Sequence, residues 1–251
     1  MAEPTYRTLV ILAKALVLAT GTRISYAGIE NVPERGGAVV AINHTSYVDW
    51  LPAALAMNRR RRRMRYMIKA EMQRVKVINF LIKRTRTIPV DRGAGAGAYA
   101  MAVQRLREGE LVGVYPEATI SRSFELKEFK TGAARMALEA NVAIIPVIVW
   151  GAQRIWTKDH PKHIGRAKLP IMVHVGPPVP AVGDIAQTDA ALREAMTGLL
   201  HEVQQRYPHP LGAYWVPRRL GGGAPTPAEA AQLDADEAAA KAASRAPHQS
   251  R

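Results

Sequence analysis

The chain has 251 residues, of which 48% are hydrophobic, enough for one large α/β domain or two small ones with a substantial core. It contains no cysteine, which excludes disulfides, a thiolate nucleophile, cysteine-ligated zinc and iron–sulfur clusters. The formal net charge of +14 indicates a polyanionic partner, such as nucleic acid, anionic lipid headgroups or a phosphate-rich cofactor.

Residues 1–23 are predicted to form a helical segment. The stretch YRTLVILAKALVLATGTR (6–23) is apolar, but Lys14 divides it into runs far shorter than the roughly 20 residues that span a bilayer. No secretory signal with an A-x-A-like cleavage site is expected. The segment is therefore either an amphipathic core helix or an interfacial helix that lies on a membrane.

Residues 24–220 alternate short apolar runs with helical patterns. The apolar runs, bounded by Gly, Pro or Asp, predict strands at 37–43, 65–70, 85–91, 111–116, 143–150 and 171–176. Helices are predicted between and after them, at 48–57, 97–109, 131–141 and 188–207. Several strands are apolar on both faces, which is typical of a buried parallel sheet. We therefore expect a single α/β domain with a mostly parallel central sheet flanked by helices.

The composition changes at Gly221. Residues 221–251 are rich in Ala, Gly and Pro, lack aromatic residues, and carry a net charge of −1. We expect a mostly disordered C-terminal tail, transiently helical around 227–243. The basic excess, +15, belongs to residues 1–220.

Polar clusters follow several predicted strands. They are NHTSYVD (43–49), VDRG (90–93), YPEATIS (115–121) and SRSFELKEFKTG (121–132). In an α/β fold, functional side chains gather where parallel strands end, so these clusters are expected to converge on one sheet edge.

His44 and Asp49 form the first candidate pair. If Asp49 begins a helix, its carboxylate can turn back, hold one ring N–H of His44 and leave the other nitrogen as a base. Alternatively, Asp49 only caps the helix and His44 is a turn residue. No G-x-S-x-G element or cysteine supplies a nucleophile, so a basic His44 would activate the hydroxyl of the substrate itself.

Other segments are less specific. The arginines Arg59, Arg60, Arg61, Arg62 and Arg63 could bind membrane phosphates, nucleic acid or cofactor phosphates, or form a solvated loop. GAGAGA (93–98) lacks the pattern of a phosphate-binding loop and is interpreted as a flexible loop. HPKH (160–163) has no third ligand nearby, so no metal site is expected.

With these clusters, the chain resembles the glycerolipid acyltransferase family over about residues 24–180. Asn43, His44, Ser46 and Asp49 match its N-H-x-S-x-x-D element, and RTIPVDRG (86–93) resembles its second block. YPEATIS resembles the third block, F-P-E-G-T-R-S, and 129–151 resembles the segment that follows.

The resemblance implies a membrane-surface O-acyltransferase that moves a fatty acyl group from acyl-CoA to a lysophospholipid, chiefly lysophosphatidate. It makes His44 the general base, oriented by Asp49. The residues that it implies for substrate binding are Asn43, Ser46, Arg92, Glu117, Thr119 and Ser121. The arginine run would contact membrane or CoA phosphates, and residues 1–23 would rest on the membrane. The protein would be peripheral or monotopic at the cytoplasmic face of the cell membrane. No tightly bound cofactor, metal or nucleic acid is expected.

The third block departs from the family at Ala118 and Ile120, where Gly and Arg are usual. The family arginine is associated with the phosphate of the acceptor, and isoleucine cannot make a charge-assisted bond. Either Arg122 takes that role or the acceptor is a different lipid or glycolipid. The alternatives from other classes are a non-catalytic basic binder of membranes or nucleic acid, and a hydrolase in which His44 activates water.

Overall fold

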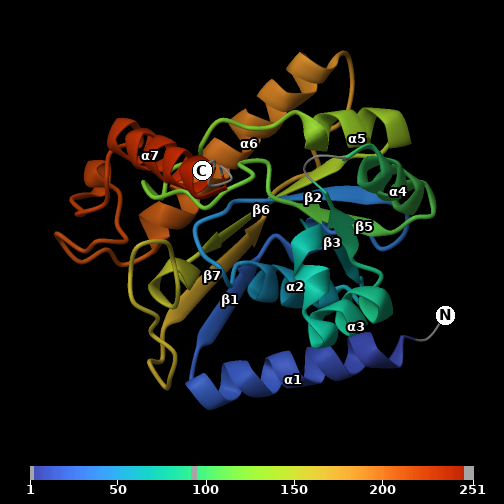
Figure 1. Ribbon diagram of the computed structural model, residues 1–251. Helices are drawn as coiled ribbons and strands as arrows, with labels where there is room; N and C mark the ends of the chain where they lie inside the picture. Colours follow the sequence, from blue (N-terminus) through green and yellow to red (C-terminus); the bar gives the residue numbers. More distant parts are fainter. Residues whose placement is uncertain (1–2, 92–94, 246–251) are drawn as a thin grey trace, which may run out of the picture. The chain divides into compact units, whose positions relative to one another are not determined.

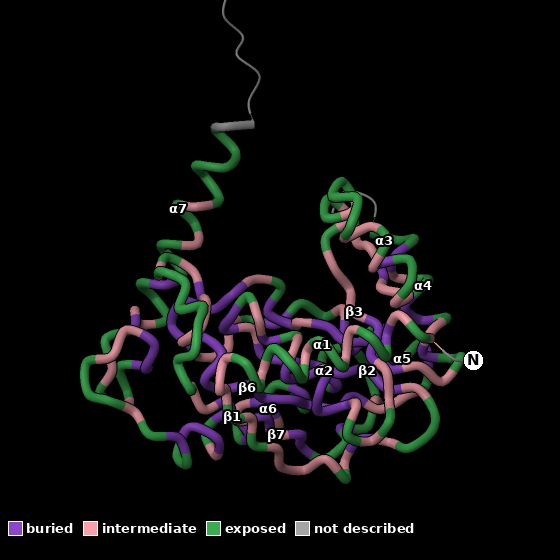
Figure 2. The backbone as a smooth tube through the Cα atoms, turned by 90° about the horizontal axis from the view of Figure 1, so that it is seen from below, coloured by how far each residue is buried: buried purple, intermediate pink, exposed green. Residues whose placement is uncertain are grey.

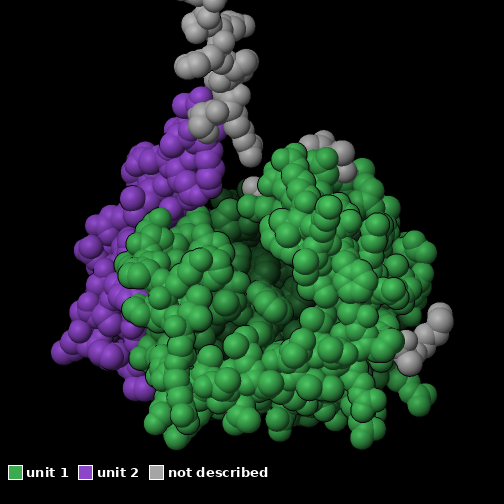
Figure 3. Space-filling model, turned by 60° about the horizontal axis from the view of Figure 1, so that its bottom comes forward, with its two compact units in different colours: residues 1–120, 128–207 green, residues 121–127, 208–251 purple. Residues whose placement is uncertain are grey.

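The computed structural model describes residues 3–91 and 95–245, with side chains described to residue 243. The chain divides into two compact units, drawn in different colours in Figure 3. Unit 1 comprises residues 1–120 and 128–207, and unit 2 comprises residues 121–127 and 208–251. The face of unit 1 drawn in Figure 3 is hollowed.

Unit 1 alternates strands and helices along the chain (Figure 1). Its strands are β1 (Arg23–Ala27), β2 (Ala38–Ile42), β3 (Met64–Lys69), β4 (Ile88–Val90), β5 (Leu111–Val114), β6 (Ile144–Trp150) and β7 (Pro170–Val175). Its helices are α1 (Pro4–Thr20), α2 (Trp50–Arg59), α3 (Lys76–Thr85), α4 (Ala96–Arg107), α5 (Gly132–Ala140) and α6 (Ile185–Arg206), with 3-10 turns η1 (Ile29–Asn31), η2 (Ala70–Arg74) and η3 (Ala152–Arg154).

The predicted strands and helices are confirmed to within a few residues, but the sequence patterns predict neither β1 nor α3. The residues of β1 are exposed or half-buried, because β1 lies at the edge of the sheet. Helix α3 buries Ile82 and is otherwise rich in exposed or half-buried side chains, so its apolar stripe is narrow.

Within the described residues, the strands form one sheet of seven in the order β1-β7-β6-β2-β5-β3-β4. Strand β2 runs parallel to both β5 and β6, with Val40 opposite Gly113 and Ile145. Strand β7 runs antiparallel to β6, with Trp150 opposite Met172. The expectation of a mostly parallel sheet is therefore confirmed. The carboxyl ends of β2, β5 and β6 meet at one edge.

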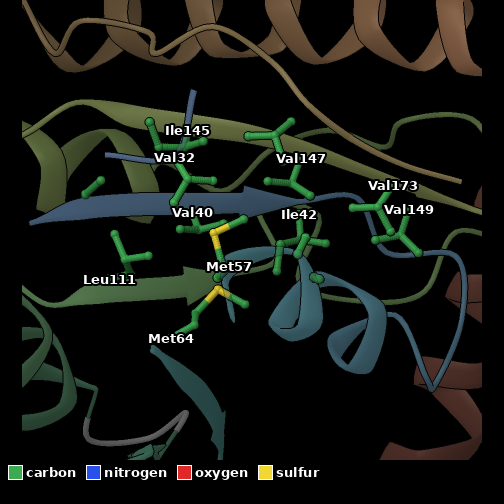
Figure 4. Close-up of a cluster of buried hydrophobic side chains, with 14 of the residues drawn as sticks. Val32, Val40, Ile42, Met57, Met64, Leu111, Ile145, Val147, Val149 and Val173 are labelled. Carbon is green, nitrogen blue, oxygen red and sulfur yellow. The ribbon is translucent and has the colours of Figure 1, made fainter. Parts of the chain in front are cut away.

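Helices cover both faces of this sheet in unit 1. Figure 1 shows α4, α5 and α6 above the strands and α1, α2 and α3 below them. Strands in the middle of the sheet are buried along their length, as the purple tube in Figure 2 shows. A cluster of apolar side chains joins the sheet to α2, with Val40, Ile42, Met57, Met64 and Leu111 almost fully buried (Figure 4). Each such side chain stabilises the fold by about 1.5–3 kcal/mol.

Helix α1 is fastened to the domain at its N-terminal end. The Glu3 carboxylate accepts hydrogen bonds from Arg65 at 2.8 and 2.6 Å, and the buried Tyr6 hydroxyl accepts one from the Met64 amide at 3.1 Å. Further along, the apolar side chains are between 54% and 81% exposed at Ile11, Leu12, Leu16 and Leu18. This exposure disfavours the core-helix alternative. None of the helices in the described ranges has the length and hydropathy needed to cross a membrane.

Unit 2 is more ordered than the predicted tail, and it has a helix where a transient one was predicted, around 227–243. It contains η4 (Arg218–Leu220) and α7 (Pro227–Arg245). Thr226 and Glu229 cap the start of α7 reciprocally, because the Thr226 amide donates to the Glu229 carboxylate at 2.7 Å and the Glu229 amide donates to the Thr226 hydroxyl at 3.2 Å. An alanine-rich sequence then continues the helix readily. The predicted domain boundary at residue 220 also differs, since unit 1 ends at Tyr207.

Candidate active site

The turn that follows β2 brings His44 and Asp49 together. His44 Nδ1 lies 3.3 Å from Asp49 Oδ2, the long end of hydrogen-bond range. Asp49 directly precedes α2, but its Oδ2 accepts from the amides of Thr45 at 2.8 Å and Ser46 at 2.7 Å instead of from the first turn of that helix. The carboxylate therefore shapes the turn and faces the histidine, and the helix-cap alternative is wrong.

The Asp49 carboxylate is fully buried. Burial raises its pKa above the usual value, against the opposing effects of His44 and of the Ser46 and Thr45 amides. Its second oxygen, Oδ1, is buried without a hydrogen-bond donor among the described residues. The charge that would hold His44 is thus kept in place at a cost in desolvation.

Besides Asp49, two residues of the segment after β5 contact His44. Its ring stacks on Tyr115 with centroids 4.0 Å apart and planes 20° apart, and its backbone amide donates to Glu117 Oε1 at 2.8 Å. Its side chain remains 19% exposed. Since Nδ1 faces Asp49, Nε2 is the nitrogen left for a substrate. Burial raises the pKa of Tyr115 well above its ordinary value, so the stacked phenol stays protonated.

The segment after β5 supplies these contacts. Glu117 is 3% exposed, and Thr119 follows on a tight turn in which its amide donates to the Glu117 carbonyl at 2.7 Å. Ala118 lies between them with φ of +59°, in the left-handed region that favours glycine. This explains why glycine is usual at that position. Ile120 is buried at 3% exposure.

Two of the predicted substrate contacts have another task in the structure. The Asn43 amide is fully buried and bridges β2 to β6, donating to the Val149 carbonyl at 3.1 Å and accepting from the Val149 amide at 2.7 Å. Ser46 Oγ, also fully buried, contacts the carbonyls of Ala152 at 3.0 Å and Trp156 at 2.7 Å. We interpret both residues as positioning the turn; their predicted contact with substrate stays a prediction.

The backbone amides of residues 44–48 all donate hydrogen bonds within the protein. His44, Thr45 and Ser46 donate to side-chain carboxylates, as described above. The Tyr47 amide donates to the Trp156 carbonyl at 3.1 Å, and the Val48 amide donates to Ser46 Oγ at 3.1 Å. An oxyanion would therefore have to be bound by donors other than the backbone amides of residues 44–48.

The remaining predicted substrate residues are Arg92, Ser121 and Arg122. Arg92 is outside the described residues. Ser121 and Arg122 belong to unit 2, where both are buried. Ser121 Oγ donates to the Glu125 carbonyl at 2.6 Å, while the Arg122 guanidinium pairs with Asp234 and, at 2.9 Å, with Glu237 of α7. Their predicted contact with an acceptor stays a prediction.

The arginine run begins at the last residue of α2 and precedes β3, so it lies at the amino end of that parallel strand, opposite the edge that carries His44. Much of it is engaged within unit 1. Arg60 pairs with Glu34 at 2.8 Å, Arg63 pairs with Glu3 at 3.5 Å, and Arg62 donates to the carbonyls of residues 33, 36 and 109. The predicted contact with membrane or CoA phosphates stays a prediction. In the part of the chain that the structure describes, no three acidic or histidine side chains gather as a metal site requires.

Sequence reasoning missed two components of this site. One is Tyr115, which stood in the third block without a role; its place next to a predicted strand end was the available signal. The other is the segment after β6, where Thr157 Oγ1 donates to the Thr45 carbonyl at 2.7 Å and Trp156 packs against Tyr47 with ring centroids 4.6 Å apart. Its sequence carries no motif, so only the fold reveals it.

Comparison with known proteins gives the site a context. The family model described as Acyltransferase matches residues 23–150. A 1-acyl-sn-glycerol-3-phosphate acyltransferase of Borreliella burgdorferi is 24% identical over 193 residues, which cover 72% of this chain and 70% of that protein. A protein of the same name from Bacillus subtilis is 31% identical over 123 residues, covering 49% of this chain and 60% of that protein.

A solved structure shares the fold. The crystal structure of the 1-acyl-sn-glycerophosphate (LPA) acyltransferase from Thermotoga maritima matches with a TM-score of 0.63 at 18% sequence identity. The match covers 78% of this chain and 81% of that one. The α/β architecture is therefore one that such a protein adopts.

Proposed function

Because the chain belongs to the acyltransferase family and is an acyltransferase, we propose that it moves a fatty acyl group from acyl-CoA to the free hydroxyl of lysophosphatidate, forming phosphatidate. The names of the relatives support this acceptor. The observation that carries the mechanism is the His44–Asp49 contact of 3.3 Å on a turn that leaves Nε2 free of Asp49.

His44 Nε2 takes the proton from the acceptor hydroxyl as the oxygen attacks the thioester carbonyl carbon. The carbon–sulfur bond of the tetrahedral intermediate then breaks, and the imidazolium returns its proton to the departing thiolate. Asp49 holds Nδ1–H toward itself and stabilises the positive ring that forms between these steps. Tyr115 stacks on the ring, and Glu117 holds the backbone amide of His44.

The acceptor and the product are lipids, so the enzyme works at a membrane surface as a peripheral or monotopic protein on the cytoplasmic face. Two apolar exposed segments of unit 1 support this. One is α1, and the other runs through η2 and α3, where Val75, Val77 and Phe80 are between 50% and 68% exposed. The second segment also contains Arg74, Lys76, Lys83 and Arg84, as suits an anionic surface.

A different acceptor is the second candidate. It is favoured by Ile120, an apolar buried residue where the family has arginine, and by Arg122, whose guanidinium already faces Asp234 and Glu237. A lipid or glycolipid without a phosphate beside the hydroxyl would need neither arginine.

The test follows thiol release from palmitoyl-CoA in detergent, with lysophosphatidate and a panel of other lysolipids as acceptors. The chain has no cysteine, so the protein adds no background to a thiol-reactive dye. Transfer to lysophosphatidate should fall by about 10²- to 10⁴-fold in His44→Ala, while the thermal unfolding midpoint stays close to that of the wild type.

Each alternative predicts a different result. A preference for an unphosphorylated lysolipid would show that this lipid, and not lysophosphatidate, is the acceptor. Thiol release without any acceptor, with free fatty acid as product, would identify a hydrolase. Absence of turnover with every donor and acceptor from folded protein would favour the non-catalytic basic binder, in which His44→Ala is silent.

A further inference from the structure

The segment between β6 and β7, residues 151–169, begins and ends at the sheet edge where His44 lies. Because β6 is parallel to β2, Trp150 and Ile42 end at the same edge. Because β7 is antiparallel to β6, the chain returns to that edge at Pro170. Figure 1 shows this segment in yellow, reaching from the end of β6 past β1 toward the C-terminal end of α1.

The first part of the segment is fastened to the His44 turn. Trp156 accepts hydrogen bonds at its carbonyl from Ser46 Oγ and the Tyr47 amide, at 2.7 and 3.1 Å, and Thr157 Oγ1 donates to Thr45 at 2.7 Å. The rings of Tyr47 and Trp156 pack 4.6 Å apart, and Tyr47 remains 42% exposed. The residues that follow therefore start next to the reacting histidine.

Residues 158–168, which we name the basic loop, carry four Lys or Arg residues and one Asp, a net charge of +3 with both histidines neutral. Lys162, Arg166 and Lys168 are exposed. Lys162 Nζ lies 4.0 Å from the Trp156 ring centroid, so a positive charge of the loop lies directly against an aromatic ring. The Lys168 amide donates to the Thr20 carbonyl at 3.3 Å, which returns the loop past the end of α1.

The arginine run and the basic loop lie at opposite edges of the sheet. The run precedes β3 at its amino end, whereas the loop lies at the carboxyl edge with His44. An acyl thioester whose carbonyl carbon lies at His44 must leave the site along that carboxyl edge. The basic loop lies at this same edge, within reach of the carrier.

We propose that the basic loop, with Tyr47 and Trp156 at its base, binds the phosphorylated nucleotide end of acyl-CoA. This inference rests on the proposed function, which brings a thioester to His44. Phosphate groups form charge-assisted hydrogen bonds with Lys and Arg, and a purine stacks on an exposed aromatic ring. An acidic carrier protein would also be attracted by the charge, but the aromatic pair beside it favours a nucleotide.

The test compares two triple variants of the full chain. Lys162→Glu, Arg166→Glu and Lys168→Glu together reverse the charge of the basic loop. Arg35→Glu, Arg107→Glu and Arg193→Glu make the same change in charge at exposed positions outside both the basic loop and the arginine run; Arg35 precedes β2, Arg107 precedes β5 and Arg193 lies on α6. Circular dichroism and thermal unfolding establish that both variants are folded.

Binding of CoA itself is measured by isothermal titration calorimetry, independently of turnover. The loop variant should bind CoA about 10-fold or more weakly, and the KM for palmitoyl-CoA in neutral detergent should rise similarly while the KM for the acceptor stays within about 2-fold. The control variant should match the wild type. Adenosine 3′,5′-bisphosphate should compete with CoA, and added salt should weaken its binding.

Several results would overturn the proposal. They are unchanged CoA binding in the loop variant, an equal loss in the control variant, and a loss seen only with an acyl-carrier-protein thioester. A loop variant that fails to bind anionic vesicles but binds CoA normally would assign the loop to the membrane instead. If the wild type binds CoA through the loop yet transfers no acyl group, the proposed function fails and the nucleotide site stands.

Discussion

Replacing Asp49 by Asn separates the role of the charge from that of the turn. Asn has nearly the same shape, and one oxygen can still accept from the amides of Thr45 and Ser46, which lie 2.8 and 2.7 Å from Asp49 Oδ2. What disappears is the negative charge 3.3 Å from His44 Nδ1. At that separation, a charged pair at an effective dielectric constant of about 20 interacts by about 5 kcal/mol.

In the transition state the proton is partly or fully transferred to His44. About half to all of this interaction energy therefore stabilises the transition state. We therefore expect kcat/KM for thiol release to fall by about 10²- to 10⁴-fold in Asp49→Asn. The assay is acceptor-dependent thiol release at neutral pH, with His44→Ala beside it and the double variant to test whether the two residues act as one unit. The double variant should be no slower than His44→Ala alone.

The same substitution, Asp49→Asn, should increase the free energy of unfolding. Burial raises the pKa of Asp49 in the folded state, so the ionised carboxylate opposes folding, and the wild type loses stability as the pH rises through that folded-state pKa. Asp49→Asn removes this loss. Its advantage over the wild type should be largest at neutral pH and vanish below the unfolded pKa of about 3.9.

Asp49→Ala is the matched control for the turn. It leaves the Thr45 and Ser46 amides without an acceptor and should destabilise the fold by about 2–5 kcal/mol in urea unfolding. An Asp49→Asn variant that retains activity within about 3-fold of the wild type would refute the reasoning, because Asp49 would then only shape the turn.

Three further predictions concern the neighbours of this pair. Tyr115→Phe should keep the stack on His44 and nearly full activity, whereas Tyr115→Leu should lower kcat/KM about 10-fold in the thiol assay; equal activity of the two would show that stacking is unimportant. Ala118→Gly should raise the free energy of unfolding by up to about 1 kcal/mol in urea because it relieves a φ of +59°, and a decrease would contradict this. Asn43→Ala should lower it by about 2–4 kcal/mol because both hydrogen bonds to Val149 are buried, and a loss of acceptor binding without a loss of stability would argue for substrate contact instead.

The same turn shows how far sequence patterns reach. An apolar run followed by NHTSYVD predicts a strand end, a histidine and a carboxylate close together, because both are local. Whether the carboxylate caps α2 or faces His44 depends on the backbone conformation of Asp49, which is helical, with φ of −55° and ψ of −32°, and not the extended conformation typical of a capping residue. The contacts of His44 with Tyr115 and Glu117 join residues more than 70 positions apart and become visible only when β2 and β5 pair.

The basic segments show the opposite case. The densest positive charge in the sequence predicted phosphate contacts at Arg59, Arg60, Arg61, Arg62 and Arg63. The direction of the strands, however, puts these residues at the amino end of β3. The basic loop has a sparser charge and no motif. It lies at the edge with His44 because β7 reverses the direction of β6.

The amino-acid sequence alone thus determined the α/β class, the alternation of elements, the His44–Asp49 pair and the family, since each depends on local periodicity or on residues close together in the chain. The tertiary structure alone decided the antiparallel β7, the ion pairs of Arg122 with α7, the bridge from Asn43 to β6, and the contacts of Ser46 that bring the segment after β6 to the His44 turn. These features depend on which strands become neighbours and in which direction they run. That choice is made by burial of the whole apolar surface, so no short stretch of sequence contains it.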